Sequence, residues 1–304
     1  MLAVAMILDG LLGESRWLRF GLPHPVVAIG SMISALEKRM NLGSNRKAKG
    51  VFALIILLFI GLLASVPLKL WQFGWIFEIL LAAILIAQRS LVDHVQAVAE
   101  GLRVSLEVGR AKVAMIVGRD PGSLDESGVA RAAIESAAEN FSDGVAAPIF
   151  WFAVAGLPGI LIYKIVNTAD SMVGHRNERY IEFGWASARL DDILNFIPAR
   201  LTGLIFALVG PSLYALNIMQ RDAPKHRSPN AGWPEGAMAA LLNVALAGPR
   251  KYDDVVVDDP YIHPEGSREC GPDDVERSVM VLWRSWQALL ICAVLMLLVQ
   301  RSLM

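Results

Sequence analysis

The sequence has few cysteines, almost no net charge and none of the common nucleotide-binding loops. Its two cysteines, Cys270 and Cys292, form no CxxC or Cys/His spacing, so neither a disulfide framework nor a zinc site is expected. The net charge of −1 gives no electrostatic case for binding nucleic acid. The patterns GxxxxGK[ST], GxGxxG and HExxH are absent, so any nucleotide site must be built in another way.

Charged residues are also missing from several long stretches of the chain. Residues 50–68, 144–163 and 201–220 carry no charge, and residues 285–300 form a shorter uncharged run. A helix needs about 20 mostly apolar residues to cross a bilayer, which the first three stretches meet. Hydrophobic residues make up 55% of the chain, above the roughly 45–50% of soluble domains. The alternative, buried core helices of a large soluble protein, is disfavoured because several separate stretches reach spanning length.

These stretches predict an all-α fold, a multi-pass integral membrane helical bundle with amphipathic and re-entrant or broken helices. We expect a single domain over residues 1–304, located in the cell (inner) membrane. Three basic residues between positions 46 and 49 place the start of the first span on the cytoplasmic side. The polar segments at about 90–142 and 221–278 are predicted to face the cytoplasm.

Local patterns refine this expectation. Residues 50–89 are expected to form a helical hairpin bent near Pro67, and the apolar residues of 90–120 recur at the spacing of one long amphipathic helix. Ser123, with Glu126 three residues on, is expected to cap a further helix that runs to about residue 142. The proline-rich segment 221–278 is predicted to form turns and short helices.

The uncharged stretch 144–163 is interrupted by Pro148 and by the pair Pro158-Gly159. Such residues break helices, and a broken or re-entrant helix is tolerated at membrane depth where protein or a wet cavity covers it. We therefore expect residues 144–200 to fold back towards a cavity that faces the cytoplasm.

Polar side chains crowd both ends of this stretch. Before it, Glu135, Glu139 and Asp143 fall at steps of four on one helix face, next to Asn140. Two groups follow it: Lys164, Asn167, Asp170, Arg176 and Arg179, and then Arg189, Asp191, Asp192, Asn195 and Arg200. Carboxylates bind Mg²⁺ through oxygen, and Arg or Lys bind phosphate oxygens, so this set suits phosphoryl transfer. The plainer interpretations are a solvated helix face before the stretch and interhelical polar pairs after it.

Long motifs follow one another in order along nearly the whole chain. They are LDGLLGE from Leu8, PHPVVAIG from Pro23, GRDPGSLDESGVARAAIESAAENFSDGVAAPIFW from Gly118, YKIVNTADSMVGHRNERYIEFGWASARLDDILNFIPARL from Tyr163 and SPNAGWPEGAMA from Ser228. A sequence with these motifs resembles the CobD/CbiB family, the adenosylcobinamide-phosphate synthases of cobalamin biosynthesis.

The resemblance implies a multi-pass membrane enzyme that performs an ATP-dependent amide ligation. It would join (R)-1-aminopropan-2-ol phosphate, or aminopropanol, to adenosylcobyric acid and give adenosylcobinamide phosphate. ATP as co-substrate and Mg²⁺ are expected. The implied partners are the corrinoid, the aminopropanol-type amine, the lipid bilayer and other membrane enzymes of the pathway.

For this chemistry the polar residues divide into expected roles. The expected Mg²⁺ ligands are Glu135, Glu139, Asp143, Asp191 and Asp192. The expected phosphate-binding cations are Lys164, Arg176, Arg179, Arg189 and Arg200, and the expected orienting amides are Asn140, Asn167 and Asn195. Asp170 is a candidate base, and Asp192 and Glu139 are further catalytic candidates.

Two other functions fit part of the same pattern. Membrane transferases also use Mg²⁺ and acidic residues at helix ends to bind diphosphate substrates, although their tighter acidic repeats are not found here. A corrinoid transporter or scaffold would also use broken helices and buried charge.

Overall fold

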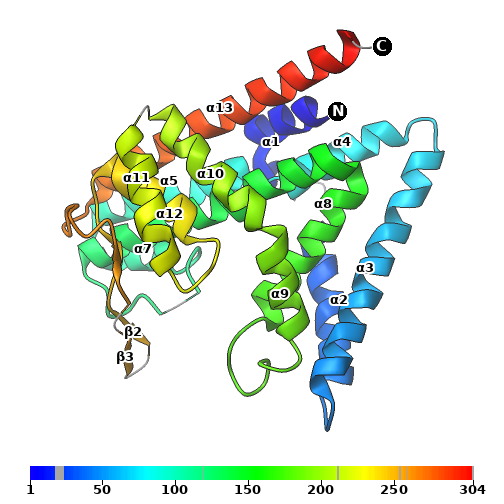
Figure 1. Cartoon of the computed structure of the whole chain (residues 1–304), viewed down its shortest axis with the longest axis horizontal. Coiled ribbons are helices and arrows are strands. Elements are labelled where there is room, and N and C mark those ends of the chain that lie inside the picture. The colour runs from blue at the N-terminus through cyan, green and yellow to red at the C-terminus, as the bar shows by residue number, and fades with distance from the viewer. Residues whose placement is uncertain (18–23, 119, 211, 253–254, 258, 303–304) are drawn as a thin grey trace. The chain divides into compact units, whose positions relative to one another are not determined.

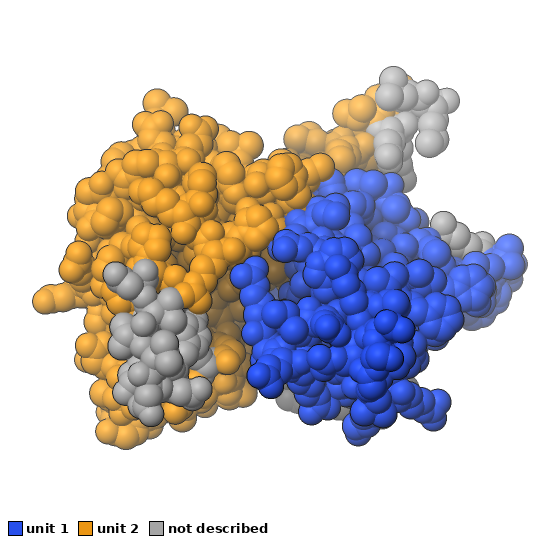
Figure 2. Space-filling view, turned by 60° about the horizontal axis from the view of Figure 1, so that its bottom comes forward, with its two compact units in different colours: residues 1–87, 147–195 blue, residues 88–146, 196–304 orange. Residues whose placement is uncertain are grey.

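The computed structural model describes the chain except residues 18–23, 119, 211, 253–254, 258 and 303–304 (Figure 1). The chain divides into two compact units, each built from two separate stretches. Unit 1 comprises residues 1–87 and 147–195, and unit 2 comprises residues 88–146 and 196–304 (Figure 2). The expectation of one domain over the whole chain stays a prediction.

Among its described residues, unit 1 consists of helices joined by turns and loops. Its helices are α1 (Leu2–Trp17), α2 (Pro25–Met40), α3 (Arg46–Leu70), α4 (Gly74–Leu85), α8 (Ala147–Val173) and α9 (Trp185–Leu194). Helices α2, α3 and α8 pack together around Ile29, Ile33, Leu57, Ile165 and Phe183. This core fixes the C-terminal half of α8 and the segment that leads into α9.

Unit 2 contains helices and two small antiparallel sheets. The helices are α5 (Gln88–Val104), α6 (Leu106–Val113), α7 (Glu126–Phe141), α10 (Phe196–Val209), α11 (Leu213–Asp222), α12 (Gly232–Leu242) and α13 (Pro272–Ser302), with a π-helical turn η2 (Ser142–Ala146) and a 3₁₀ turn η3 (Ala223–Lys225). Strand β1 (Leu246–Ala247) pairs with β4 (Tyr261–Ile262), and β2 (Arg250–Tyr252) pairs with β3 (Val255–Val257).

Long apolar helices confirm the predicted multi-pass helical bundle. Among the described residues, four helical segments are long and apolar enough to cross a membrane: Arg46–Leu68, Gly74–Val104, Glu126–Val173 and Pro272–Val299. The bent pair of α9 and α10 adds a fifth candidate. These segments match the roughly 30 Å hydrocarbon core of a bilayer.

The predicted break in the uncharged stretch 144–163 lies at Gly156. This residue has φ 64° and ψ −149°, two positions before Pro158 and inside α8. Only glycine adopts such a backbone conformation readily. Pro158 has no N–H with which to continue the helical ladder. The broken helix is therefore confirmed.

Two predicted continuous helices are wrong. The run 201–220 is not one span, because α10 ends at Val209 and α11 begins at Leu213. The sequence Gly210-Pro211 explains the interruption, since the residue before a proline disfavours the helical region. The predicted helix over 90–120 is divided at Ser105, which is extended and accepts a hydrogen bond from Val108 N at 3.3 Å to start α6.

The start of α7 and the content of residues 221–278 also differ from expectation. Asp125, rather than Ser123, caps α7 by accepting a hydrogen bond from Gly128 N at 2.7 Å. An aspartate two positions later is an equally good cap, and Glu126 then lies in the first turn. The segment 221–278 contains short strands that its proline content obscured.

Candidate functional site

A polar cluster joins the C-terminal half of α8 to α9 within unit 1. Asn167 on α8 donates to Asp191 Oδ1 at 3.3 Å, and Asn195 donates to Asp191 Oδ2 at 3.0 Å. Tyr163 donates its hydroxyl proton to Asn195 Oδ1 at 2.9 Å. Tyr163, Asn167 and Asp170 lie at i, i+4 and i+7, so they share one face of α8. The amides thus hold the Asp191 carboxylate in one orientation.

Two further carboxylates, Asp170 and Asp192, lie near enough to affect the cluster electrostatically. The charge of Asp170 repels those of both Asp191 and Asp192. Asp191 is only 9% exposed, whereas Asp192 is partly exposed and lies 3.3 Å from Arg189 Nη1. Like charges at this depth cost free energy unless a cation compensates them. The cluster therefore offers oxygen ligands to a positively charged partner.

Two glycines allow α8 and α9 to approach one another. A Cβ on Gly174 would lie 1.9 Å from Asp170 Oδ1, and a Cβ on Gly184 would lie 1.7 Å from Val173 O. Neither position can hold a larger residue without a backbone shift. The loop between these glycines therefore returns the chain closely enough for Asp191 to reach Asn167.

The cationic candidates of unit 1 have different surroundings. Arg179 forms two hydrogen bonds of 3.1 Å with the buried carboxylate of Glu37 on α2, which ties the loop 174–184 to α2. Lys164 is buried at 9% exposure. Arg176 is exposed and has no hydrogen bond or ion pair with the residues that the structure describes. Arg176 is therefore better placed than Arg179 for binding phosphate oxygens.

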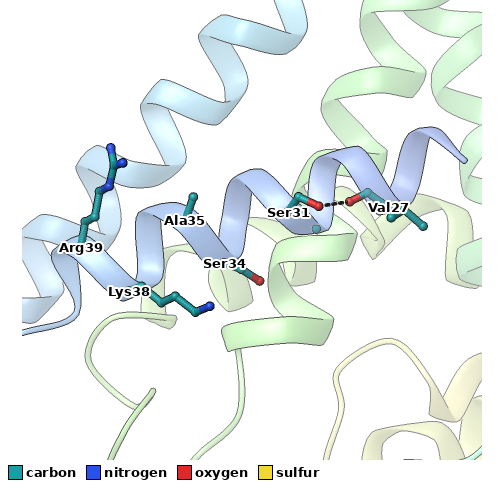
Figure 3. Close-up of a pocket in the computed structure, with 7 residues that line it drawn as sticks. Val27, Ser31, Ser34, Ala35, Lys38 and Arg39 are labelled. Atoms are coloured by element: carbon teal, nitrogen blue, oxygen red, sulfur yellow. Dashed lines mark hydrogen bonds between the residues drawn. The ribbon is translucent and has the colours of Figure 1, made fainter. Parts of the chain in front are cut away.

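Helix α2 borders an open groove of about 730 Å³ (Figure 3). Ser34 and Lys38 project to one side of α2, and Arg39 projects to the other (Figure 3). All three residues line the groove, and a spacing of four places Ser34 and Lys38 on one face. Neither Lys38 nor Arg39 was predicted from the sequence as a phosphate-binding residue.

The residues predicted before the uncharged stretch lie in unit 2 and do not share one environment. Glu135 is buried and accepts a hydrogen bond from Ala247 N at 2.7 Å, at the start of the β1–β4 sheet. Glu139 and Asn140 are exposed, and Asn140 donates to Ser136 Oγ at 2.8 Å. Asp143 lies in the π-helical turn η2. Such turns often occur at functional sites.

Arg200 on α10 is held between two aromatic rings. Its guanidinium lies 3.6 Å from the ring centroid of Phe196 and 4.6 Å from that of Trp233. It also donates to Asn230 Oδ1 at 3.1 Å and to Phe196 O at 2.7 Å. Arg200 thus fixes the Ser228–Glu235 segment, a contact that spacing along the sequence did not indicate.

A second buried carboxylate, Asp222 in unit 2, was also missed. It is 0% exposed and accepts from Arg221 at 2.7 and 2.8 Å, from Lys225 at 2.7 Å and from His263 N at 2.9 Å. Burial acts to raise the pKa of Asp222, but these hydrogen bonds outweigh it and hold the pKa below its usual value. Glu265 accepts from the other side of Arg221, which lowers the pKa of Glu265 to about 2.

The structure therefore brings together the predicted residues of α8 and α9. Tyr163 joins them, and its position four residues before Asn167 was the available signal. Among the described residues, no group of three His, Cys, Asp or Glu side chains is placed to hold a metal ion by itself. A metal ion at these carboxylates would therefore need further ligands from outside the cluster.

Comparisons with known proteins agree over almost the full chain. A family model described as CobD/Cbib protein matches residues 2–282. The cobalamin biosynthesis protein CobD of Sinorhizobium fredii is 48% identical over 301 residues, which cover 94% of this chain and 92% of that protein. Proteins of the same name from Brucella suis (48% identical; 93% and 92% covered) and Rhodobacter capsulatus (49%; 94% and 93%) are similar. No solved structure matches.

Proposed function

The chain belongs to the CobD/CbiB family, and from that premise we propose that it is an enzyme of cobalamin biosynthesis. Its reaction is the ATP-dependent joining of (R)-1-aminopropan-2-ol phosphate, or aminopropanol, to adenosylcobyric acid. With the phosphorylated amine the product is adenosylcobinamide phosphate. The observation that carries the proposal is the amide-held Asp191 carboxylate beside Asp170 and Asp192.

The chemistry requires activation of a carboxylate. A carboxylate is a poor acyl donor, so its oxygen first attacks the γ-phosphorus of ATP, and ADP leaves. The amine then attacks the carbonyl carbon of the resulting acyl phosphate. The C–N bond forms, the C–O bond to phosphate breaks, and a base takes the proton that the nitrogen loses. Positioning and charge neutralisation supply most of the rate enhancement in phosphoryl transfer.

The donor set of the cluster fits Mg²⁺ that arrives with a nucleotide. Mg²⁺ is usually bound through one or two carboxylates together with substrate phosphates and water, rather than by a complete protein cage. Asp191 and Asp192 supply such oxygens, and their repulsion with Asp170 is relieved by a cation. The metal would neutralise phosphate charge during transfer.

The protein's own residues have the following roles in this proposal. Asn167 and Asn195 orient Asp191, and Asp170 accepts the proton from the amine. Lys164 and Arg176 bind phosphate oxygens. Arg179 and Arg200 position the segments that they tie down. The expectation that Glu135, Glu139 and Asp143 bind Mg²⁺ stays a prediction from the sequence.

We place this site at the cytoplasmic side of the inner membrane, where ATP is available. A cysteine at exposed Glu178, in a background with Cys292 replaced by serine, tests the side. An impermeant thiol reagent should label it only after the cytoplasmic face is opened. Labelling in intact cells would contradict this topology.

The proposed reaction is tested with the purified full-length protein in detergent. The assay contains adenosylcobyric acid, ATP, Mg²⁺ and either aminopropanol phosphate or aminopropanol, and the corrinoid product is identified by mass. We expect amide product, with one ADP and one phosphate formed for each amide. ATP-independent corrinoid uptake into proteoliposomes without any amide product would overturn the proposal in favour of a transporter.

A further inference from the structure

A cavity of about 310 Å³ is lined by residues of α10, of α12, of α13 and of the connection between α10 and α11, all in unit 2. Much of its wall is apolar, formed by Val209, Leu241, Met280 and Val281 among others. Arg277 and Arg284 supply its charged groups. The cavity therefore combines a hydrocarbon surface with two cations.

The two arginines lie on one face of α13. They are seven residues apart, which is two helical turns. Arg277 forms an exposed ion pair with Asp274 at 3.0 Å. Such pairs contribute little to stability, so Arg277 can exchange Asp274 for another anion. No residue of the described part of the chain forms a hydrogen bond or ion pair with Arg284. An anion in the cavity would therefore meet available guanidinium groups.

The sequence around Arg284 indicates the level of the membrane surface. Arg284 is the last charged residue before the uncharged run 285–300. Trp283 and Trp286 flank it, with ring centroids 5.6 Å apart in an edge-to-face arrangement. Tryptophan is enriched where the lipid head groups meet the hydrocarbon core. The cavity thus lies at the level of the membrane where the charged head group of a lipid joins its apolar acyl chains.

We propose that this cavity binds one anionic phospholipid. Its phosphate contacts Arg277 and Arg284, and its acyl chain lies along Val209, Leu241 and Met280. Basic pockets between transmembrane helices recognise anionic head groups through charge. The apolar wall of the cavity would shield the acyl chain of the lipid from water. Free phosphate would satisfy the arginines but would leave the apolar wall without a partner, so the lipid complements more of the site.

The test uses the purified full-length protein in a neutral detergent. Phosphatidylglycerol and phosphatidylcholine with identical acyl chains are titrated separately, and retained lipid is counted by native mass spectrometry. We expect one retained phosphatidylglycerol per chain and weaker retention of phosphatidylcholine. Arg284→Gln and Arg277→Gln should each weaken phosphatidylglycerol binding about fivefold, the usual effect of one basic residue.

A matched control and a second variant keep the test sharp. Lys112→Gln removes an exposed cation of α6, outside the candidate spans, and should leave lipid binding unchanged. Met280→Trp should fill the apolar part and reduce binding although both arginines remain; Met280 is 51% exposed, so the larger side chain is accommodated. Unchanged binding in Arg284→Gln or Met280→Trp, or displacement of the lipid by excess inorganic phosphate, would overturn the proposal.

Discussion

Two buried carboxylates of this protein differ in what surrounds them. Asp222 in unit 2 accepts hydrogen bonds from Arg221, from Lys225 and from a backbone N–H. Asp191 in unit 1 accepts from two neutral amides and is repelled by neighbouring carboxylates. The first charge is compensated by neighbouring cations, whereas the second is oriented by amides and pairs with no cation among the residues that the structure describes.

This difference separates a structural carboxylate from a ligand-binding one. A buried charge with its own cations contributes to the fold, and removing one partner leaves the others uncompensated. A buried carboxylate held by amides among like charges is stabilised when a cation binds beside it or when it takes up a proton. Sites that bind ligands often retain such unfavourable arrangements at some expense of stability.

The largest effect is expected from Asp222→Asn. The substitution keeps the shape of the side chain but leaves Arg221 and Lys225 without their shared anion. We expect a loss of about 3 kcal/mol in the free energy of unfolding, at the low end for a broken buried pair because both cations are half exposed. Thermal unfolding in detergent measures it. A melting temperature equal to that of the wild type would remove the distinction between the two carboxylates.

Asp191→Asn should instead lower activity without lowering stability. Asp191→Asn relieves repulsion with Asp170, so the melting temperature should be unchanged or slightly higher. The turnover rate should fall about 100-fold, as for the loss of one preorganised electrostatic group. Amide-product formation measures this loss. Asp93→Asn, which removes an exposed carboxylate paired with Arg89, is the control and should retain full activity. An unstable but active Asp191→Asn protein would reverse the assignment.

Arg200→Lys sharpens the contrast between binding and positioning. A lysine keeps the charge but cannot stack between Phe196 and Trp233 or reproduce the planar fork that reaches Asn230. If Arg200 is a positioning residue, activity should fall about tenfold in both Arg200→Lys and Arg200→Gln, with about 1 kcal/mol lost in stability. A direct phosphate contact would instead be largely restored by lysine. Comparing KM for ATP and kcat in the two variants distinguishes these outcomes.

The smallest effect concerns pH. The pKa values of Asp222 and Glu265 are lowered in the folded protein. The two carboxylates therefore stabilise the folded protein fully at a pH above their unfolded-state pKa values of about 4. This stabilisation is lost as the pH falls through their folded-state pKa values. The wild-type melting temperature should decline below about pH 4 more steeply than that of Asp222→Asn. Parallel curves would show that Asp222 is not linked to stability in this way.

The prolines of the stretch 144–163 predicted a broken helix, which the structure shows at Gly156. Periodicity and charge spacing predicted the membrane helices, because these depend on neighbouring residues. They also selected the residues of the α8–α9 cluster. They could not predict that Asn167 reaches Asp191 across 24 positions, because this contact depends on how closely Gly174 and Gly184 let the chain return. The stacking of Arg200 on Trp233 is a tertiary contact of the same kind.

The most direct measurement of the central claim is binding of Mn²⁺·ATP to the purified full-length protein, followed by electron paramagnetic resonance. Mn²⁺ prefers the same oxygen ligands as Mg²⁺. We expect the wild type and Asp93→Asn to bind the complex equally well, and Asp191→Asn to bind it at least about tenfold more weakly while remaining folded. Equal binding by folded Asp191→Asn would contradict the assignment of this carboxylate cluster to the metal–nucleotide.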